Sequence, residues 1–494
     1  MDFAPILPAA LLTAGLLGVL LADLIGKGRR PGVPMGMALG SLVAAGLAAL
    51  RLETSHEVVL GVLVVDKFAV VFTVFCCATG AISIVATTRG ETFRRPGGEF
   101  LALVLSSVLG MTLLAMSVDI VMLYLAFETI SIPSYVLVAM RRADPAGNEA
   151  GLKYVLFGAV SSAVMLYGLS MIVGLSGGTS LAALGAAVEA GVASQPMFIV
   201  SCVFVFAGFA FKISAVPFHF WSPDVYAGAP ASVAGFLSVA SKAAGFAGLV
   251  RVVSFTVPQA SGAAADPIGA FLPGGNPFFT IMAVSAVLTM TMGNLAALRQ
   301  REIKRLLAWS SIAHAGYVLL VLSVWTERAM AALLLYLVAY LFMNLAAFLI
   351  AGLVIRERGT DEISALRGIG RRNIGLAVAF AIVLFSLTGL PPFFGFVAKL
   401  QVFYAVFEQQ YVWLGVIGLI NGVISLYYYA RVIAVMYLEE DGAQEVTPLR
   451  LAWFDRVFCA ALVIPILVFG FFWSEIWVWA QDVARDLPIV LGAR

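Results

Sequence analysis

The amino-acid sequence predicts an all-α polytopic membrane protein that crosses the bilayer about 14 times. Of its 494 residues, 62% are hydrophobic and only 12% are charged, and the mean hydropathy is +1.00. A soluble protein is nearer half apolar and a quarter charged. The apolar residues also fall into runs of roughly 20, the length that a helix needs to cross the hydrocarbon core. A lipid bilayer is therefore the natural solvent for this chain.

Each predicted span is one of these apolar runs. The runs are centred in 3–26, 33–50, 60–88, 99–117, 118–140, 150–175, 196–223, 229–253, 276–298, 309–325, 328–355, 373–407, 411–436 and 453–478. The junctions at 117/118 and near 226 contain almost no polar loop. The longest loops lie near 176–195, 254–275 and 437–452 and are rich in Gly, Ala and Pro. We therefore expect no soluble domain.

The first span is predicted to be retained rather than cleaved. Asp2 precedes its apolar run, and the basic residues Lys27, Arg29 and Arg30 follow it. A secretory signal peptide carries its positive charge before the apolar run. This order predicts an N-terminus outside the membrane.

The basic residues of the loops give the orientation of the remaining spans. Loops after odd-numbered spans hold nineteen of them: Lys27, Arg29, Arg30, Arg89, Arg94, Arg95, Arg141, Arg142, Arg299, Arg301, Lys304, Arg305, Arg356, Arg358, Arg367, Arg371, Arg372, Arg450 and Arg456. Loops after even-numbered spans and the C-terminal tail hold five: Arg51, Arg251, Arg328, Arg485 and Arg494. Because cytoplasmic loops carry the excess of Lys and Arg, both termini are predicted outside.

Charge, cysteine usage and short motifs exclude several classes of function. The net charge of +2 gives no large basic field for nucleic acid. The cysteines all lie in apolar runs without a C-x-x-C pair, which favours buried thiols over disulfides or zinc: Cys76, Cys77, Cys202 and Cys459. The sequence has no Walker loop, dinucleotide fingerprint or H-E-x-x-H motif. Its three histidines are too scattered for haem pairs, so we expect no redox chemistry on this chain.

Six basic residues remain inside the predicted spans. Two of them, Lys67 and Arg431, lie near span ends, where they can reach the interface or pair with an acid. The other four are lysines flanked by apolar residues on both sides: Lys153, Lys212, Lys242 and Lys399. Glu128 is the matching acid within a span.

These five groups are costly in a bilayer. An ionised residue at the centre of a helix costs about 2.5–3.5 kcal/mol on insertion scales. Together they would cost over about 12 kcal/mol, which rivals the stability of a typical domain. Since one acid cannot pair with four lysines, the excess lysines must be hydrated or neutral. This favours a proton or ion path over static ion pairs.

Lysine suits a proton path because an apolar environment favours its neutral form and a nearby carboxylate favours its charged form. We expect Glu128 to pair with Lys212 and to hold it protonated. His219 and His314 titrate closer to neutral pH and can relay protons. A core packing role remains the alternative for each histidine.

Two predicted spans are interrupted close to a lysine. Pro217 follows Lys212, and Pro391 and Pro392 precede Lys399. Proline removes a backbone donor and clashes with the preceding turn, so each site predicts a broken helix. The broken spans are the seventh and the twelfth. Their odd offset, and the opposite order of lysine and break, indicate two repeats of inverted orientation.

The longest specific motif is KISAVPFHFWSPDVYAGAPASVAGFLSVASKAAGF, from Lys212 to Phe246. With NEAGLKYVLFGAVSSAVMLYG, REIKRLLAWSSIAHAGY and LTGLPPFFGFVAKL, it resembles the antiporter-like membrane subunits of proton-pumping NADH:quinone oxidoreductase, respiratory complex I. The resemblance runs from about the third span to the thirteenth. A lysine at Lys399, and the lack of a long C-terminal arm, are similar to the N-type branch, the counterpart of the mitochondrially encoded subunit 2.

The resemblance implies a bundle of 14 helices with two inverted five-helix repeats. It divides the chain into segments 1–98, 99–253, 276–436 and 453–494, of which the middle two are the repeats. It implies that the family's proton-path residues are Glu128, Lys153, Lys212, His219, Lys242 and Lys399. His314 lies in a recognisable motif, but its role varies within the family.

The resemblance also implies the setting of the chain. Other membrane-arm subunits, including further antiporter-like ones, would be its partners within the bilayer. NADH, FMN, iron–sulfur clusters and quinone would bind those partners, with no cofactor on this chain. Heavy use of Ala and Gly favours a bacterial inner membrane. Two alternatives stay open, a subunit of a Mrp-type cation/proton antiporter and a structural module whose ion pairs set packing.

Overall fold

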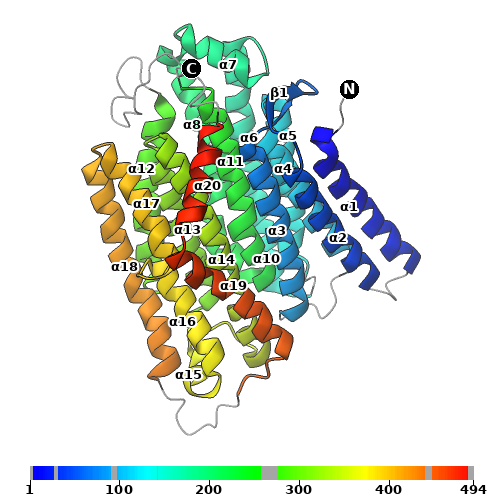
Figure 1. Ribbon diagram of the computed structural model, residues 1–494, viewed down its shortest axis with the longest axis vertical. Helices are drawn as coiled ribbons and strands as arrows, with labels where there is room; N and C mark the ends of the chain where they lie inside the picture. The colour runs from blue at the N-terminus through cyan, green and yellow to red at the C-terminus, as the bar shows by residue number, and fades with distance from the viewer. Residues whose placement is uncertain are drawn as a thin grey trace.

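Helices make up most of the computed structural model, which describes residues 4–26, 32–90, 97–141, 143–257, 276–439 and 448–487. Within these residues, 13 helices are long and apolar enough to cross a membrane. They lie side by side as one bundle (Figure 1). The predicted fold class is confirmed, and the chain is a multi-pass membrane protein.

The elements follow the chain closely in order. The first half contains α1 (Leu7–Gly26), α2 (Gly32–Leu50), β1 (Ser55–Val59), β2 (Leu63–Val65), α3 (Lys67–Arg89), α4 (Gly98–Met116), α5 (Ile120–Val138), α6 (Pro145–Ser176), α7 (Leu181–Glu189), α8 (Pro196–Ile213), α9 (Trp221–Gly228), α10 (Ala231–Phe236) and α11 (Lys242–Ser254). The second half contains α12 (Pro277–Ala297), α13 (Ile303–Leu322), α14 (Glu327–Arg358), α15 (Ile369–Arg372), α16 (Ile374–Thr388), α17 (Phe394–Glu408), α18 (Val412–Tyr437), α19 (Trp453–Phe471) and α20 (Ser474–Arg485).

The prediction for the start of the third span was wrong. Residues 55–65 form an antiparallel hairpin, and its tip has positive φ at Leu60 and Gly61. Its β-branched valines favour strands, although they are apolar enough to resemble part of a span. Asp66 then caps α3 by accepting a hydrogen bond from the backbone N–H of Ala69 at 2.8 Å.

The seventh span is broken, as predicted from Pro217. α8 ends at Ile213, Ser214 takes a left-handed conformation with φ of 60°, and α9 begins at Trp221. The indole N–H of Trp221 donates to the carbonyl of Phe211 at 3.0 Å, which satisfies one of the open carbonyls at the end of α8.

The twelfth span is broken in the same manner. α16 ends at Thr388, Gly389 takes φ of 90°, and α17 begins at Phe394. Each half-helix has 15 residues, too few to cross the bilayer alone. Together they supply the predicted twelfth span, so every predicted span has a helical counterpart among the described residues.

Three expectations about loops need correction or fall outside the structure. The expected loop near 176–195 contains α7, capped by the hydroxyl of Ser180. Arg251, expected in a loop, is buried in α11 and forms hydrogen bonds of 2.6 Å with both carboxylate oxygens of Asp66, because a paired guanidinium tolerates burial. The expected loop cations outside the described residues are Lys27, Arg29, Arg30, Arg94, Arg95, Arg142 and Arg494.

The start of α1 and the end of α20 lie at the same end of the bundle, the end of the β1–β2 hairpin and α7 (Figure 1). An even number of spans requires this arrangement. The beginnings of α16 and α19 lie towards the opposite end. The division into four segments and the inverted relation of the middle two stay predictions.

Candidate functional site

Three of the four apolar-flanked lysines are buried inside the bundle. The exposed fractions are 1% for Lys212, 3% for Lys242 and 5% for Lys399. Lysine is almost never fully buried unless its ammonium is hydrogen-bonded or paired. Each of the three lies on an irregular helix, either broken or interrupted by a wider turn, and the partners of each ammonium define the site.

Lys212 lies in the last turn of α8, just before the first break. Its Nζ donates to the hydroxyl of Ser131 on α5 at 2.7 Å and lies 4.8 Å from the ring centre of Phe127. Ser131 is one helical turn from Glu128, whose charge still acts on Lys212. The carboxylate of Glu128 itself accepts a hydrogen bond from Ser162 on α6.

The expected direct ion pair between Glu128 and Lys212 is therefore not formed. Ser131 takes the hydrogen bond of the ammonium, and Ser162 occupies the carboxylate. Serine at this position lets a neutral hydroxyl lie between the two charges. The acid consequently acts through space and through the orientation of α5.

Lys242 is the first residue of α11 and directly follows a π-helical segment, Leu237–Ser241. Such wider turns are frequent at functional sites because they shift the side chains that follow. The ammonium of Lys242 donates to the carbonyl of Ser311 on α13 at 3.0 Å. It also lies 5.9 Å from the ring centre of Tyr226.

His314 follows Ser311 by one turn on α13 and is 4% exposed. Its Nδ1 is hydrogen-bonded to the hydroxyl of Tyr336 at 2.6 Å, and its Nε2 lies 3.5 Å from the hydroxyl of Tyr429. Both Lys242 and Lys399 act electrostatically on this ring. His314 thus lies between the two lysines.

Lys399 follows the second break, and its side chain folds back across it. The ammonium donates to the carbonyls of Leu387 at 3.0 Å and Thr388 at 2.8 Å, at the end of α16. These carbonyls carry the negative end of the helix dipole and favour a cation. The ammonium also lies 4.6 Å from the ring centre of Tyr317, one turn beyond His314.

His219 lies within the first break and is 1% exposed. Its ring packs between Phe220, with ring centres 4.3 Å apart, and Trp309, with ring centres 5.7 Å apart. Neither ring nitrogen is hydrogen-bonded to a described residue. The structure therefore does not join His219 to the buried lysines by a direct contact.

The expectation that Lys153 is an unpaired charge within the bilayer was wrong. Its side chain is 37% exposed and pairs with Asp224 of α9 at 2.7 Å and Glu149 at 2.8 Å. α6 begins at Pro145, so Lys153 lies only two turns from its start. Arg305 also approaches Asp224, at 3.6 Å.

The buried groups form a continuous polar axis through the bundle. Lys212 packs against Gly245, one turn after Lys242, where an added Cβ would lie 3.1 Å from the lysine Cγ. In order, the axis is Ser131, Lys212, Lys242, Ser311, His314, Tyr317 and Lys399. The axis thus joins the two broken helices.

Sequence reasoning missed several members of this site. Ser131 and Tyr317 could have been found, because each lies one turn from a predicted residue, Glu128 or His314. Asp224 had a signal too, as an acid in the same interrupted segment as Lys212. Tyr336 and Tyr429 carry no such signal, since only the packing of α14 and α18 brings them to His314.

Comparisons with known proteins agree with this fold. Residues 117–425 match the family described as NADH:quinone oxidoreductase/Mrp antiporter, transmembrane. The chain is 42% identical to NADH-quinone oxidoreductase subunit N of Anaeromyxobacter sp. strain Fw109-5, covering 96% of this chain and 95% of that relative. It is 39% identical to subunit N of Moorella thermoacetica, over 97% of this chain and 98% of that relative.

Two solved structures have similar folds. A chain of respiratory complex I from Thermus thermophilus is 29% identical, with a TM-score of 0.77 over 96% of this chain and 99% of that one. A chain of the Mrp complex from Dietzia sp. is 19% identical, with a TM-score of 0.83 over 99% of this chain and 98% of that one. The second likeness shows the shared fold.

Proposed function

This chain belongs to the NADH:quinone oxidoreductase/Mrp antiporter membrane family, and from that membership we propose that it is the N-type proton-translocating subunit of a NADH:quinone oxidoreductase. The observation that carries the proposal is the buried axis from Ser131 to Lys399, with three buried lysines along it. Such an axis can hold and pass protons, whereas static ion pairs would need a buried acid beside each lysine.

The switch of this relay is the surrounding of Lys212. In the described state, Ser131 and the charge of Glu128 stabilise its ammonium form. A conformational change in the complex that moves α5 would weaken both effects at once. The apolar surroundings would then favour the neutral amine, and the proton would leave Lys212 towards Lys242.

The remaining steps follow the axis. The proton passes from Lys242 by way of His314 and its tyrosine neighbours to Lys399, and Lys399 releases it to the outside. Lys153, paired with Asp224 of the same broken span, serves the input side. His219, in the break itself, tunes or connects this input. With both termini outside, the beginning of α6 lies on the inner side, from which protons are taken up.

The setting of the chain is proposed with its function. Other membrane subunits of the complex surround it, and NADH, FMN, iron–sulfur clusters and quinone bind to partner subunits. The chain itself would then contribute proton transfer and no redox step. We propose the bacterial inner membrane as its location, with both termini outside.

The first test asks which complex contains the chain. The tagged chain is solubilised gently from native membranes and followed for NADH:quinone reductase activity. We expect it to co-migrate with that activity and with flavin and iron–sulfur partners. Co-migration with only small hydrophobic proteins, together with sodium-dependent exchange, would instead favour a Mrp-type antiporter, the alternative that the Dietzia fold likeness supports.

The second test addresses the site. Lys212→Ala and Glu128→Ala should each lower NADH-driven proton translocation and turnover together, with the complex still assembled. Lys67→Ala, which removes a half-exposed lysine paired with Asp482, is the matched control. Normal pumping in both site variants, with altered stability alone, would support the structural-module alternative.

A further inference from the structure

α16 and α19 enclose a groove of about 550 Å³ near the beginnings of both helices. A groove of this size is within the range of small-molecule sites, about 300–1,000 Å³. Its walls are apolar, with Val378 and Ile382 on α16 and Val463 and Ile464 on α19. Val378 and Ile464 are 44% and 53% exposed, so the groove opens to the outside of the bundle.

Two cations lie at one end of this groove. Arg372, just before α16, and Arg456, in the first turn of α19, both line it and are both exposed. Neither guanidinium makes a hydrogen bond or ion pair with any residue that the structure describes. The groove therefore combines two open positive charges with an apolar wall below them.

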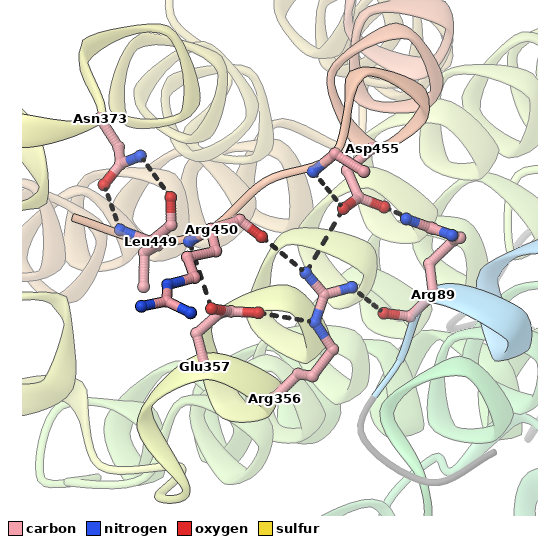
Figure 2. A network of polar contacts seen from close by, with 8 residues as sticks. Arg89, Arg356, Glu357, Asn373, Leu449, Arg450 and Asp455 are labelled. Carbon is pink, nitrogen blue, oxygen red and sulfur yellow. Dashed lines mark hydrogen bonds and ion pairs between the residues drawn. The ribbon is translucent and has the colours of Figure 1, made fainter. Parts of the chain in front are cut away.

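The one carboxylate of the groove does not offset these charges. Asp455 has a fully buried side chain that accepts hydrogen bonds from Arg89 at 2.5 Å and Arg356 at 3.3 Å (Figure 2). It also accepts from the backbone N–H of Ala452 at 3.0 Å. Its charge is thus turned inward and neutralised by two other arginines.

The two walls of the groove are held together at the same end. Figure 2 shows Asn373, the residue before α16, facing Leu449 in the segment that leads to α19. The Leu449 N–H donates to Asn373 Oδ1 at 2.8 Å, and Asn373 Nδ2 donates to the Leu449 carbonyl at 3.2 Å. The mouth of the groove is therefore preformed.

Aromatic residues place this mouth at the level of the lipid headgroups. Trp453 is 75% exposed and Phe454 is 43% exposed, both at the start of α19. Exposed tryptophan is typical of the boundary between hydrocarbon and water. The apolar part of the groove then lies within the hydrocarbon layer, directly below the two arginines.

We propose that this groove binds an anionic phospholipid, with its headgroup phosphate at Arg372 and Arg456 and an acyl chain between α16 and α19. Basic pockets between membrane helices bind anionic lipid headgroups in this way. The apolar wall below the cations selects a lipid over free phosphate, which would use only the mouth. With the proposed orientation, the site faces the inner leaflet.

The test uses the full complex in nanodiscs that contain photoactivatable phosphatidylglycerol or, separately, photoactivatable phosphatidylcholine. Cross-linked peptides are mapped by mass spectrometry. We expect phosphatidylglycerol to label α16 and α19 more strongly, by roughly fivefold for each cation near the surface. The double variant R372Q/R456Q should remove this preference, and Ala379→Phe, which fills the groove, should reduce labelling by both lipids.

The double variant R299Q/R301Q is the matched control, because both arginines are exposed loop cations away from the groove. It should keep the full preference for phosphatidylglycerol. Equal labelling by the two lipids, or cross-links from the groove to another subunit, would overturn the proposal. So would loss of the preference on adding inorganic phosphate at millimolar concentration, because the site would then recognise phosphate alone.

Discussion

The two broken helices hold their lysines in different ways. In the first, Lys212 precedes the break and reaches out to a hydroxyl on another helix, Ser131 of α5. In the second, Lys399 follows the break and reaches back to the carbonyls of Leu387 and Thr388 in its own span. One ammonium depends on the position of a neighbouring helix, and the other is held by the backbone of the break.

This difference assigns the two lysines different parts in a relay. A group held by a movable neighbour can change its proton affinity when that neighbour moves, which suits a switch. A group held by fixed carbonyls keeps a constant environment, which suits a terminal station. The axis between them, through Lys242 and His314, lets the first control the supply of protons to the second.

The largest expected effect comes from the glycine of the second break. Gly389→Ala should lower proton translocation by roughly tenfold or more, because a non-glycine residue at this φ costs about 1–3 kcal/mol. The added Cβ would also lie 2.7 Å from Lys399 Cδ. The measurement is NADH-driven acidification in inverted vesicles, normalised to assembled complex.

Gly245→Ala is the matched substitution beside Lys212. Its added Cβ would lie 2.9 Å from Ile213 and 3.1 Å from Lys212 Cγ, without strain from a positive φ. Its effect should therefore be smaller than that of Gly389→Ala. The reverse order would contradict the view that the second break is the fixed one.

A second pair of substitutions separates side-chain support from backbone support. Ser131→Ala should lower translocation by about tenfold, because a hydrogen bond to a charged group contributes about 1.5–3 kcal/mol. Thr388→Ala should have almost no effect, since Lys399 uses the carbonyl of Thr388 rather than its hydroxyl. Equal effects of the two would remove the proposed distinction.

The smallest effect is expected in the middle of the axis. Tyr336→Phe removes the 2.6 Å hydrogen bond to His314 Nδ1 and leaves the ring in place. A neutral hydrogen bond contributes about 1 kcal/mol, so translocation should fall by about threefold. Initial rates of acidification in vesicles measure this change. A loss as large as that of Gly389→Ala would make His314, rather than Lys212, the controlling group.

Much of the fold and part of the site could be predicted from the sequence. Apolar length and loop charge identified the spans, and proline identified both breaks, because these signals are local. The hairpin at 55–65 was missed because its valines satisfy a hydropathy criterion as well as a strand does. Lys153 was misplaced because apolar neighbours in sequence do not reveal an acid, Asp224, that approaches from another helix.

The partners of the buried lysines were the hardest to predict. Lys399 is held by backbone carbonyls, which every residue carries, so no sequence pattern marks them. Lys212 was expected to contact Glu128, and the contact is instead with Ser131, one turn further along α5. A sequence gives the helix face of such a residue, but the rotation of the facing helix decides which turn makes the contact.

The central claim is that Lys212 and Lys399 must lose and regain a proton, and arginine tests it most directly. Arginine keeps the positive charge and the hydrogen-bonding capacity but stays protonated in proteins. We would measure NADH-driven proton translocation in Lys212→Arg and Lys399→Arg, with Lys67→Arg as the control. The account predicts assembled complexes that translocate almost no protons in the two axis variants and normally in the control. Normal translocation in Lys212→Arg and Lys399→Arg would show that a fixed charge suffices, and would contradict the relay.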